Sequence, residues 1–156
     1  MKLYCMRHCE ALSSQEDPER ALSAHGRQDA DTMANFLKSK QAIIGHVLHS
    51  SKLRTKQTAD IIALALPIEK ITECDTLLSE NMDVMPLVDM IQTWDSDTLL
   101  VGHMPFIPRL IATLCQIDAY VVIEQFSTGT LACLVQSDEG SWQLNWVQSP
   151  EDLQQV

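Results

Sequence analysis

The sequence contains no long hydrophobic run. No segment approaches the roughly 20 consecutive apolar residues that a membrane-spanning helix requires. Near the amino terminus, Arg7 and His8 interrupt the apolar residues before the h-region of a signal peptide, about 7–15 residues long, could form. We therefore expect no association with a membrane and a cytoplasmic location.

Paired cysteines are also missing. The chain has five cysteines, an odd number, and no two of them have the Cys-x-x-Cys spacing that is typical of structural zinc sites and redox motifs. This pattern argues against a disulfide framework and favours reduced thiols, in agreement with a cytoplasmic protein.

Basic residues are scarce. The 11 lysines and arginines stand against 21 aspartates and glutamates, which gives a formal net charge of −10. Such a surface repels the phosphate backbone, so nucleic acid is not the expected partner, and a protein partner would present basic residues to it. Any anionic substrate must be held by local arginines. The carboxylates form no cluster suited to Mg²⁺, so we expect no metal and no cofactor.

Linkers rich in proline, glycine or serine are absent, and so are internal repeats. With 156 residues, of which 46% are hydrophobic, the chain is long enough to bury one core and too short for two. We expect a single domain that covers residues 1–156.

The apolar residues that are present follow clear periodicities. Helical spacing marks four segments: residues 30–37, 52–66, 84–91 and 107–114. Apolar runs of strand length lie at three places, each followed by a helix: residues 3–6, 47–50 and 98–102. Alternating strands and helices predict a three-layer α/β/α sandwich around a mostly parallel sheet, and the period of two near the C-terminus predicts an antiparallel strand pair.

Four polar residues follow the ends of predicted strands. Arg7 and His8 come directly after the first strand, Arg54 follows the second after a short loop, and His103 closes the third. Ligands of open α/β sheets bind outside the carboxyl ends of the strands, so we expect these side chains to form one anion-binding site. The other histidines lack such a position and are expected to be structural: His25, His46 and His49.

Arg54 gives a second indication of a bound anion. If Ser51 caps the predicted helix, Arg54 lies in its first turn, where a cation opposes the helix dipole. An anion bound at this point would remove the conflict.

These residues resemble the histidine phosphatases, the phosphoglycerate-mutase-like superfamily. Residues 7–10, Arg-His-Cys-Glu, are similar to the Arg-His-Gly-Glu signature, and Leu22-Ser23 with Gly26 is similar to the Leu-Thr-x-x-Gly opening of the first helix. Residues 50–59 resemble Ser-Pro-x-x-Arg-Ala-x-Gln-Thr-Ala, and Val101-Gly102-His103 matches the second histidine. Residues 142–146 look like the end of the short SixA-type phosphohistidine phosphatases of signal transduction.

The resemblance implies a phosphatase that hydrolyses phosphohistidine on a protein, such as a phosphotransfer domain or a phosphocarrier. Neutral His8 would attack phosphorus and become transiently phosphorylated. Arg7, Arg54 and His103 would bind the phosphoryl oxygens and stabilise the transition state without a metal. Their positive charge would also keep His8 unprotonated.

Two further positions are candidates for the site. Cys9 replaces the glycine of the signature, and we expect it to border the substrate and, beside His8 and two arginines, to have thiolate character. Glu80 is the nearest candidate along the chain for the acid that protonates the leaving group in larger family members. A phosphohistidine substrate asks less of that acid, because an imidazole nitrogen can leave already protonated.

Three alternatives remain to be weighed. A cysteine-based tyrosine phosphatase needs an arginine where this chain has Gln15. A non-catalytic phosphoprotein-binding module has little need of a nucleophile beside two arginines. A phosphatase of small phosphate monoesters would, as the resemblance implies, have long insertions that cover the pocket. The spacing of His8, Arg54 and His103 leaves no room for a cap domain, so we expect an open pocket and a phosphohistidine-containing protein as substrate. We also expect the protein to be a monomer.

Overall fold

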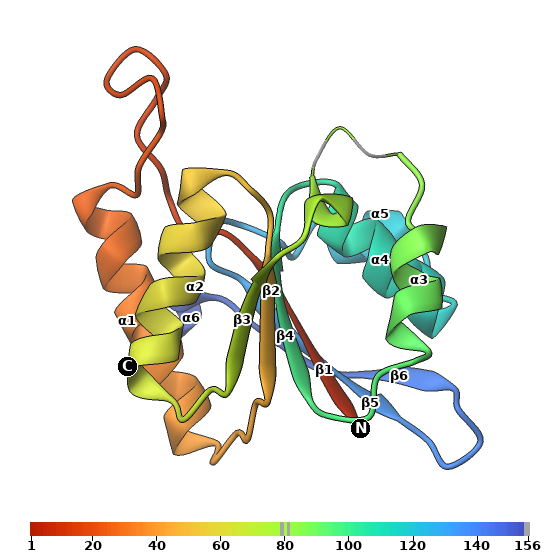
Figure 1. Cartoon of the computed structure of the whole chain (residues 1–156). Coiled ribbons are helices and arrows are strands. Elements are labelled where there is room, and N and C mark those ends of the chain that lie inside the picture. Colours follow the sequence, from red (N-terminus) through yellow and green to blue (C-terminus); the bar gives the residue numbers. More distant parts are fainter. Residues whose placement is uncertain (79, 81, 155–156) are drawn as a thin grey trace.

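The fold is built on one sheet of six strands (Figure 1). The computed structural model describes all residues except 79, 81, 155 and 156. Within the described part the strand order is β3-β2-β4-β1-β5-β6, with these bounds: β1 Lys2–Arg7, β2 His46–His49, β3 Lys70–Glu73, β4 Thr98–Gly102, β5 Leu131–Gln136 and β6 Trp142–Gln148. The first four strands in this order are parallel, whereas β5 pairs antiparallel with both β1 and β6. The predicted sheet is thus confirmed.

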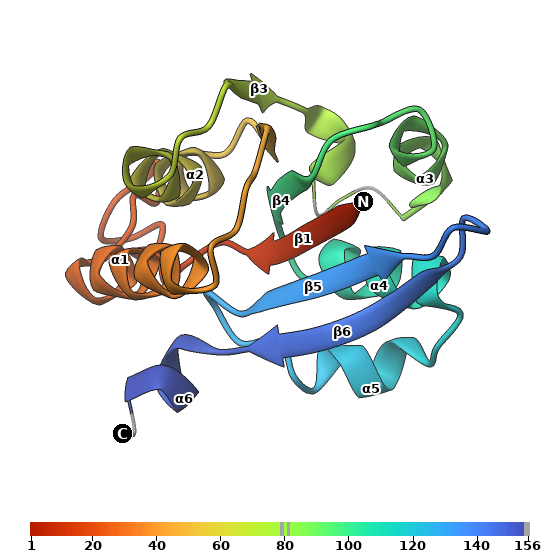
Figure 2. The same cartoon turned by 90° about the horizontal axis from the view of Figure 1, so that it is seen from below.

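Helices form a layer on each side of the sheet (Figures 1 and 2). Helices α1 (Ala24–Ser39) and α2 (Leu53–Ala65) lie on one side, together with the short α6 (Pro150–Gln154). The other side has α3 (Met85–Ile91), α4 (Phe106–Cys115) and α5 (Ala119–Ile123), and a 3-10 turn, η1, spans Asp75–Leu77. The α-helices therefore belong to the two outer layers, as the predicted three-layer sandwich requires.

The central strand β1 separates two hydrophobic cores. Leu3 and Cys5 belong to the core under α3, α4 and α5, whereas Tyr4 and Met6 belong to the core under α1 and α2. This division follows from the period of two in a strand, because successive side chains point to opposite faces. Complete burial of an aliphatic side chain contributes about 1.5–3 kcal/mol, so both faces hold β1 in place.

Register brings the strand ends to one edge of the sheet. Arg7 at the end of β1 pairs with Gly102 at the end of β4, and His49 at the end of β2 pairs with Val101. The residues that follow these strands therefore leave the sheet side by side.

Some elements differ from the sequence-based expectation. Ser51 does not cap α2: the N-cap is Lys52, and it makes no capping hydrogen bond through its side chain. Strand β3 has no hydrophobic pattern, because only Thr72 in it is even partly buried. An edge strand of this kind gives the sequence no periodicity from which it could be predicted.

None of the helices in the described part of the chain has the length and apolar composition of a membrane span.

The first helix begins against the loop that follows β1. The Ser23 hydroxyl accepts a hydrogen bond from the Gly26 backbone N–H at 2.9 Å and donates one to the Glu10 carboxylate at 2.8 Å. A Cβ atom at Gly26 would overlap the carbonyl oxygen of Glu10. Glycine is thus needed here for a close approach between the helix and the segment that contains His8.

We expect Gly26→Ala to destabilise the fold by about 1–3 kcal/mol, as overpacking does. Alanine normally stabilises a helix relative to glycine, so the sign of the change identifies the steric conflict. Urea unfolding measures it, with Gln28→Ala on the exposed side of α1 as the control. An equal or higher stability of Gly26→Ala would contradict the close approach.

Candidate active site

A pocket of about 270 Å³ lies at the carboxyl edge of the sheet. Its walls combine the predicted basic residues with side chains from the neighbouring loops: Arg7, His8, Glu10, Ala11, Arg20, Arg54, His103, Met104 and Thr128. Three separate strand ends thus deliver Arg7, His8, Arg54 and His103 to one place, as the sequence analysis expected.

His8 is held as a neutral imidazole in a defined tautomer. Its Nδ1 lies 2.7 Å from the carbonyl oxygen of Cys9, and a carbonyl can only accept, so Nδ1 has the proton and Nε2 is left with a free lone pair. The pKa of His8 is lowered to about 3, mainly by burial. The hydrogen bond to Cys9 acts in the opposite direction, and His103, Arg54 and Arg7 lower the pKa further. Desolvation therefore contributes more to the neutral state than the neighbouring charge that the sequence analysis invoked.

Backbone hydrogen bonds fix the position of His8. Its N–H donates to the carbonyl of Gly102 at 3.0 Å, and the N–H of Gly129 donates to the His8 carbonyl at 3.0 Å. Gly129 has a φ of +80°, and a Cβ atom there would lie 2.8 Å from Pro150. Backbone hydrogen bonds thus connect His8 to β4 and to the turn before β5.

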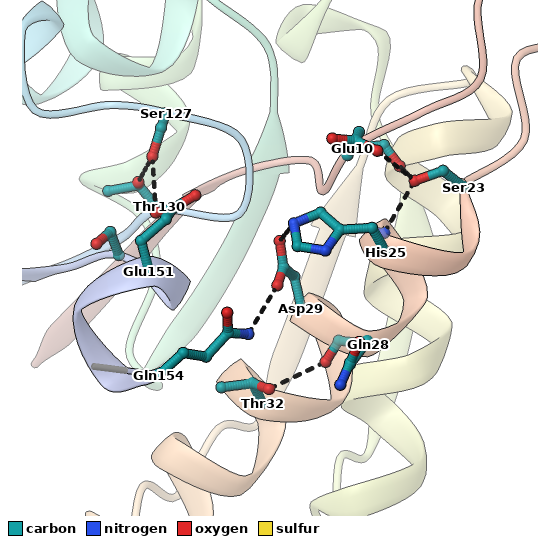
Figure 3. A network of polar contacts seen from close by, with 12 residues as sticks. Glu10, Ser23, His25, Gln28, Asp29, Thr32, Ser127, Thr130, Glu151 and Gln154 are labelled. Atoms are coloured by element: carbon teal, nitrogen blue, oxygen red, sulfur yellow. Dashed lines mark hydrogen bonds and ion pairs between the residues drawn. The ribbon is translucent and has the colours of Figure 1, made fainter. Parts of the chain in front are cut away.

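Helix α6 supports that turn from behind (Figure 3). Glu151 accepts a hydrogen bond from the Ser127 hydroxyl at 3.2 Å, and Gln154 donates to the buried carboxylate of Asp29 on α1 at 3.1 Å. The same carboxylate lies 3.2 Å from His25. These contacts give His25 a partner within α1 and connect α6 to α1 and to the loop before β5.

The two arginines have unused donors. Arg7 donates from Nη1 to the carbonyl of Phe126 at 3.0 Å, but the Nε atoms of Arg7 and Arg54 are buried and have no hydrogen-bond partner among the described residues. Burial lowers the pKa of both guanidinium groups, and the positive charge of Arg20 lowers that of Arg54 further. A buried donor without a partner is costly, and both guanidinium groups line the pocket, so they have hydrogen-bonding capacity for an oxyanion bound there.

His103 is oriented by a buried serine. The rings of His8 and His103 meet edge to face, with centroids 5.3 Å apart, and His103 Nε2 lies 2.7 Å from the Ser50 hydroxyl. That hydroxyl also lies 2.7 Å from the Thr55 hydroxyl at the start of α2. Burial and then the charge of Arg54 lower the pKa of His103 to about 4.

Two polar residues of the site, Arg20 and Ser50, were not predicted from the sequence. Arg20 lies on the loop between β1 and α1, which projects beyond the sheet (Figure 1), and its side chain returns to donate from Nε to the carbonyl of Leu12 at 3.0 Å. No strand end or periodicity marks such a residue. Ser50 could have been found, since it follows β2 directly and opens the motif that contains Arg54.

Glu80 is not brought into this pocket. Its side chain is exposed and lines a different hollow, together with Thr76 and Met82. Among the described residues that line the pocket of His8, Glu10 is the one carboxylate. The geometry therefore gives no support to Glu80 as the acid. No group of three or more His, Cys, Asp or Glu side chains in the described part of the chain is arranged to hold a metal ion.

The expectation for Cys9 is wrong. Its side chain is completely buried and cannot border a substrate, while its backbone N–H donates to the Thr58 hydroxyl at 3.1 Å. Burial raises the pKa of the thiol to about 12, so a thiolate does not form at neutral pH. Desolvation is the largest cause, and the negative charge of Asp29 raises the pKa further. This geometry also excludes Cys9 as the nucleophile of a cysteine-based phosphatase.

We expect Cys9 to resist alkylation in the folded protein. Iodoacetamide should modify the partly exposed Cys74 first, while Cys9 reacts only after denaturation. Peptide mapping by mass spectrometry after a timed exposure measures both rates. Modification of Cys9 as fast as that of Cys74 would show that its thiol is accessible and reactive.

Comparisons with known proteins agree with this geometry. The model of the histidine phosphatase superfamily (branch 1) matches residues 3–85. Phosphohistidine phosphatase SixA of Escherichia coli (strain K12) is 28% identical over 158 residues, which cover 98% of this chain and 96% of that protein.

Solved structures of similar shape extend the likeness to nearly the whole chain. A structure of the protein histidine phosphatase SixA complexed with tungstate has a TM-score of 0.87 at 28% identity and covers 98% of this chain and 99% of its own. A SixA structure from Agrobacterium tumefaciens has a TM-score of 0.78 at 24% identity, with 96% and 97% covered, which shows the common fold. Since the family model spans more than half of the chain, this protein belongs to the histidine phosphatase superfamily, branch 1.

Proposed function

We propose that this protein hydrolyses phosphohistidine on partner proteins through a phosphohistidine intermediate on His8. The observation that supports it most directly is the pair of buried Nε–H groups of Arg7 and Arg54, which have no partner among the described residues and lie beside a neutral histidine. Two guanidinium donors and one free imidazole lone pair match a phosphoryl group: the donors bind its oxygens, and the lone pair reaches its phosphorus.

The reaction proceeds in two displacements. In the first, Nε2 of His8 forms a bond to phosphorus as the bond between phosphorus and the substrate imidazole breaks. In the second, water attacks the phosphoryl group on His8, releasing inorganic phosphate and restoring the neutral imidazole. Arg7, Arg54 and His103 stabilise the charge on the equatorial oxygens in both steps.

The low pKa of His8 determines how it acts. With a pKa of about 3, the imidazole needs no general base to remove a proton before it attacks. The hydrogen bond from Nδ1 to the Cys9 carbonyl also accommodates the positive charge that develops when Nε2 binds phosphorus.

The leaving group needs little help from an acid. A substrate imidazole that is protonated on its distal nitrogen leaves as a neutral molecule when the bond to phosphorus breaks. This suits a pocket in which Glu10, the one carboxylate among its described lining residues, already accepts a hydrogen bond from Ser23. An alkyl phosphate would expel an alkoxide and would need a dedicated donor.

The size of the pocket favours a protein as substrate. Its volume of about 270 Å³ is at the lower limit of the roughly 300–1,000 Å³ of pockets that enclose small ligands. His8 is only 7% exposed and His103 only 2%, so the phosphoryl group must enter deeply while the rest of the substrate stays outside. A phosphohistidine that projects from a protein surface has the required reach.

A non-catalytic phosphoprotein-binding module is the second candidate. It would need the arginines but not the free lone pair of His8, which the Cys9 carbonyl maintains by binding the other ring nitrogen. Multiple turnovers of phosphoramidate by the purified protein distinguish catalysis from binding.

We expect Ser50→Ala to lower kcat about 10–100-fold with little change in KM, because His103 Nε2 loses its buried partner. Ser50 acts as a positioning residue, so the loss should appear in the transition state rather than in substrate binding. Steady-state kinetics with phosphoramidate measure it, and Ser137→Ala in the exposed β5–β6 turn is the control. Kinetics within twofold of the wild type would remove Ser50 from the mechanism.

We expect Arg54→Lys to lower kcat/KM on the order of 10²-fold or more, because an ammonium group cannot reproduce the fixed fork of a guanidinium. Circular dichroism and thermal unfolding control for the fold. A lysine variant of nearly wild-type activity would place Arg54 outside the phosphoryl site.

The substrate class is tested by comparing kcat/KM for a phosphohistidine protein with a panel of small phosphate monoesters, including sugar phosphates and phosphoglycerates. We expect the phosphoprotein to be favoured on the order of 10²-fold, since only it supplies binding energy outside the pocket. His8→Ala should be inactive on all of them. A monoester that wins by a wide margin would overturn the protein-substrate proposal and leave the His8 mechanism standing.

A further inference from the structure

A second hollow, of about 510 Å³, lies beside the catalytic pocket and shares Arg20 and Arg54 with it. It opens between the projecting loop that precedes α1 and the first turn of α2. Its charged lining is mostly basic: Arg20, Lys52, Arg54 and Lys56, together with Glu19. We call it the basic hollow.

Most cations of the basic hollow have no ion-pair partner. Among the described residues, Lys56 pairs with Asp60 at 2.8 Å, whereas Arg20, Lys52 and Arg54 have no carboxylate within ion-pair distance. Carboxylates are abundant in a chain with a formal net charge of −10. Unpaired cations gathered at one edge of such a protein indicate a surface that meets an anion.

The catalytic phosphoryl group does not account for all of this charge. Arg7 and Arg54 have the unused donors that point to one oxyanion. Arg20 and Lys52 remain, and their positive charges act on the site, since both contribute, after burial and Arg54, to the lowered pKa of His103. The basic hollow therefore has room and charge for a second anionic group.

Contacts within the loop hold Arg20 beside the basic hollow. Arg20 has a φ of 54°, in the left-handed region that residues other than glycine rarely adopt. The Asp17 carboxylate accepts hydrogen bonds from the backbone N–H groups of Glu19 and Ala21, at 3.1 and 2.8 Å. Arg20 Nε also donates to the carbonyl of Leu12, so contacts within the loop hold both the backbone and the side chain of Arg20.

We propose that the basic hollow binds carboxylate side chains that flank the phosphohistidine on the partner protein. This inference rests on the proposed function and extends it to the choice of partner. The net charge of the chain predicted a partner with basic residues, but the charge around the pocket is locally reversed. The groups next to the phosphohistidine are therefore acidic, and the acidic remainder of the surface directs the partner to this edge.

The test uses Lys52→Glu, which reverses a charge in the basic hollow outside the catalytic pocket. Lys70→Glu, at the opposite edge of the sheet on β3, makes the same change of charge and is the control. Each enzyme is assayed with phosphoramidate and with a phosphotransfer protein that has carboxylates within one helical turn of its phosphohistidine. A form of that protein with these carboxylates changed to amides completes a double-mutant cycle.

Lys52→Glu should lower kcat/KM for the acidic phosphoprotein roughly tenfold more than for phosphoramidate, as loss of steering charge does. The amide form of the partner should remove this difference, and Lys70→Glu should change neither substrate by more than about twofold. Equal losses on both substrates, no loss, or a loss that persists with the amide partner would overturn the inference.

Binding separates this inference from the proposed function. In a His8→Ala background the phosphoprotein is not consumed, so its Kd can be titrated with and without Lys52→Glu. If Lys52→Glu increases the Kd only for the carboxylate form of the partner, the result supports binding of carboxylates by the basic hollow. This holds even if the wild-type enzyme fails to dephosphorylate that protein. If Lys52→Glu leaves the Kd unchanged, the basic hollow does not bind the partner's carboxylates, even if hydrolysis is fast.

Discussion

The hydrogen bond between His8 Nδ1 and the carbonyl oxygen of Cys9 determines what the site can do. It fixes the tautomer, so the lone pair of Nε2 is available for a phosphorus atom. The backbone bonds from His8 N–H to Gly102 and from Gly129 N–H to His8 hold the ring at the end of β1, and burial keeps it neutral.

Positive charges gather around the His8 ring. The protein is acidic as a whole, yet Arg7, Arg20 and Arg54 meet at the carboxyl edge of the sheet without a carboxylate partner among the described residues. These cations are partly buried and close to the site, so salt screens their charges less than it screens exposed charges. We propose that this edge binds a phosphoryl group and, through Lys52, a carboxylate beside it.

Much of this arrangement could be predicted from the sequence, because strand ends and helical periodicity place Arg7, His8, Arg54 and His103 without any knowledge of side-chain packing. Cys9 could not be placed in this way: whether a residue beside His8 faces the pocket or the core depends on Thr58 and on the turn at Gly129. Arg20 belongs to a loop, whose path no periodicity encodes. The position of Glu80 was inferred only from its order along the chain, and the fold puts its side chain in another hollow.

The most direct test of the account is to trap the intermediate on His8. The wild-type protein is mixed with a radiolabelled phosphohistidine protein, quenched in alkali, in which a phosphoramidate survives, and digested for mapping. If His8 is the nucleophile, the label lies on the peptide that contains His8 and is absent from the His8→Ala variant, which should no longer release phosphate. Label on any other residue, or undiminished release of phosphate by His8→Ala, would contradict this role of His8.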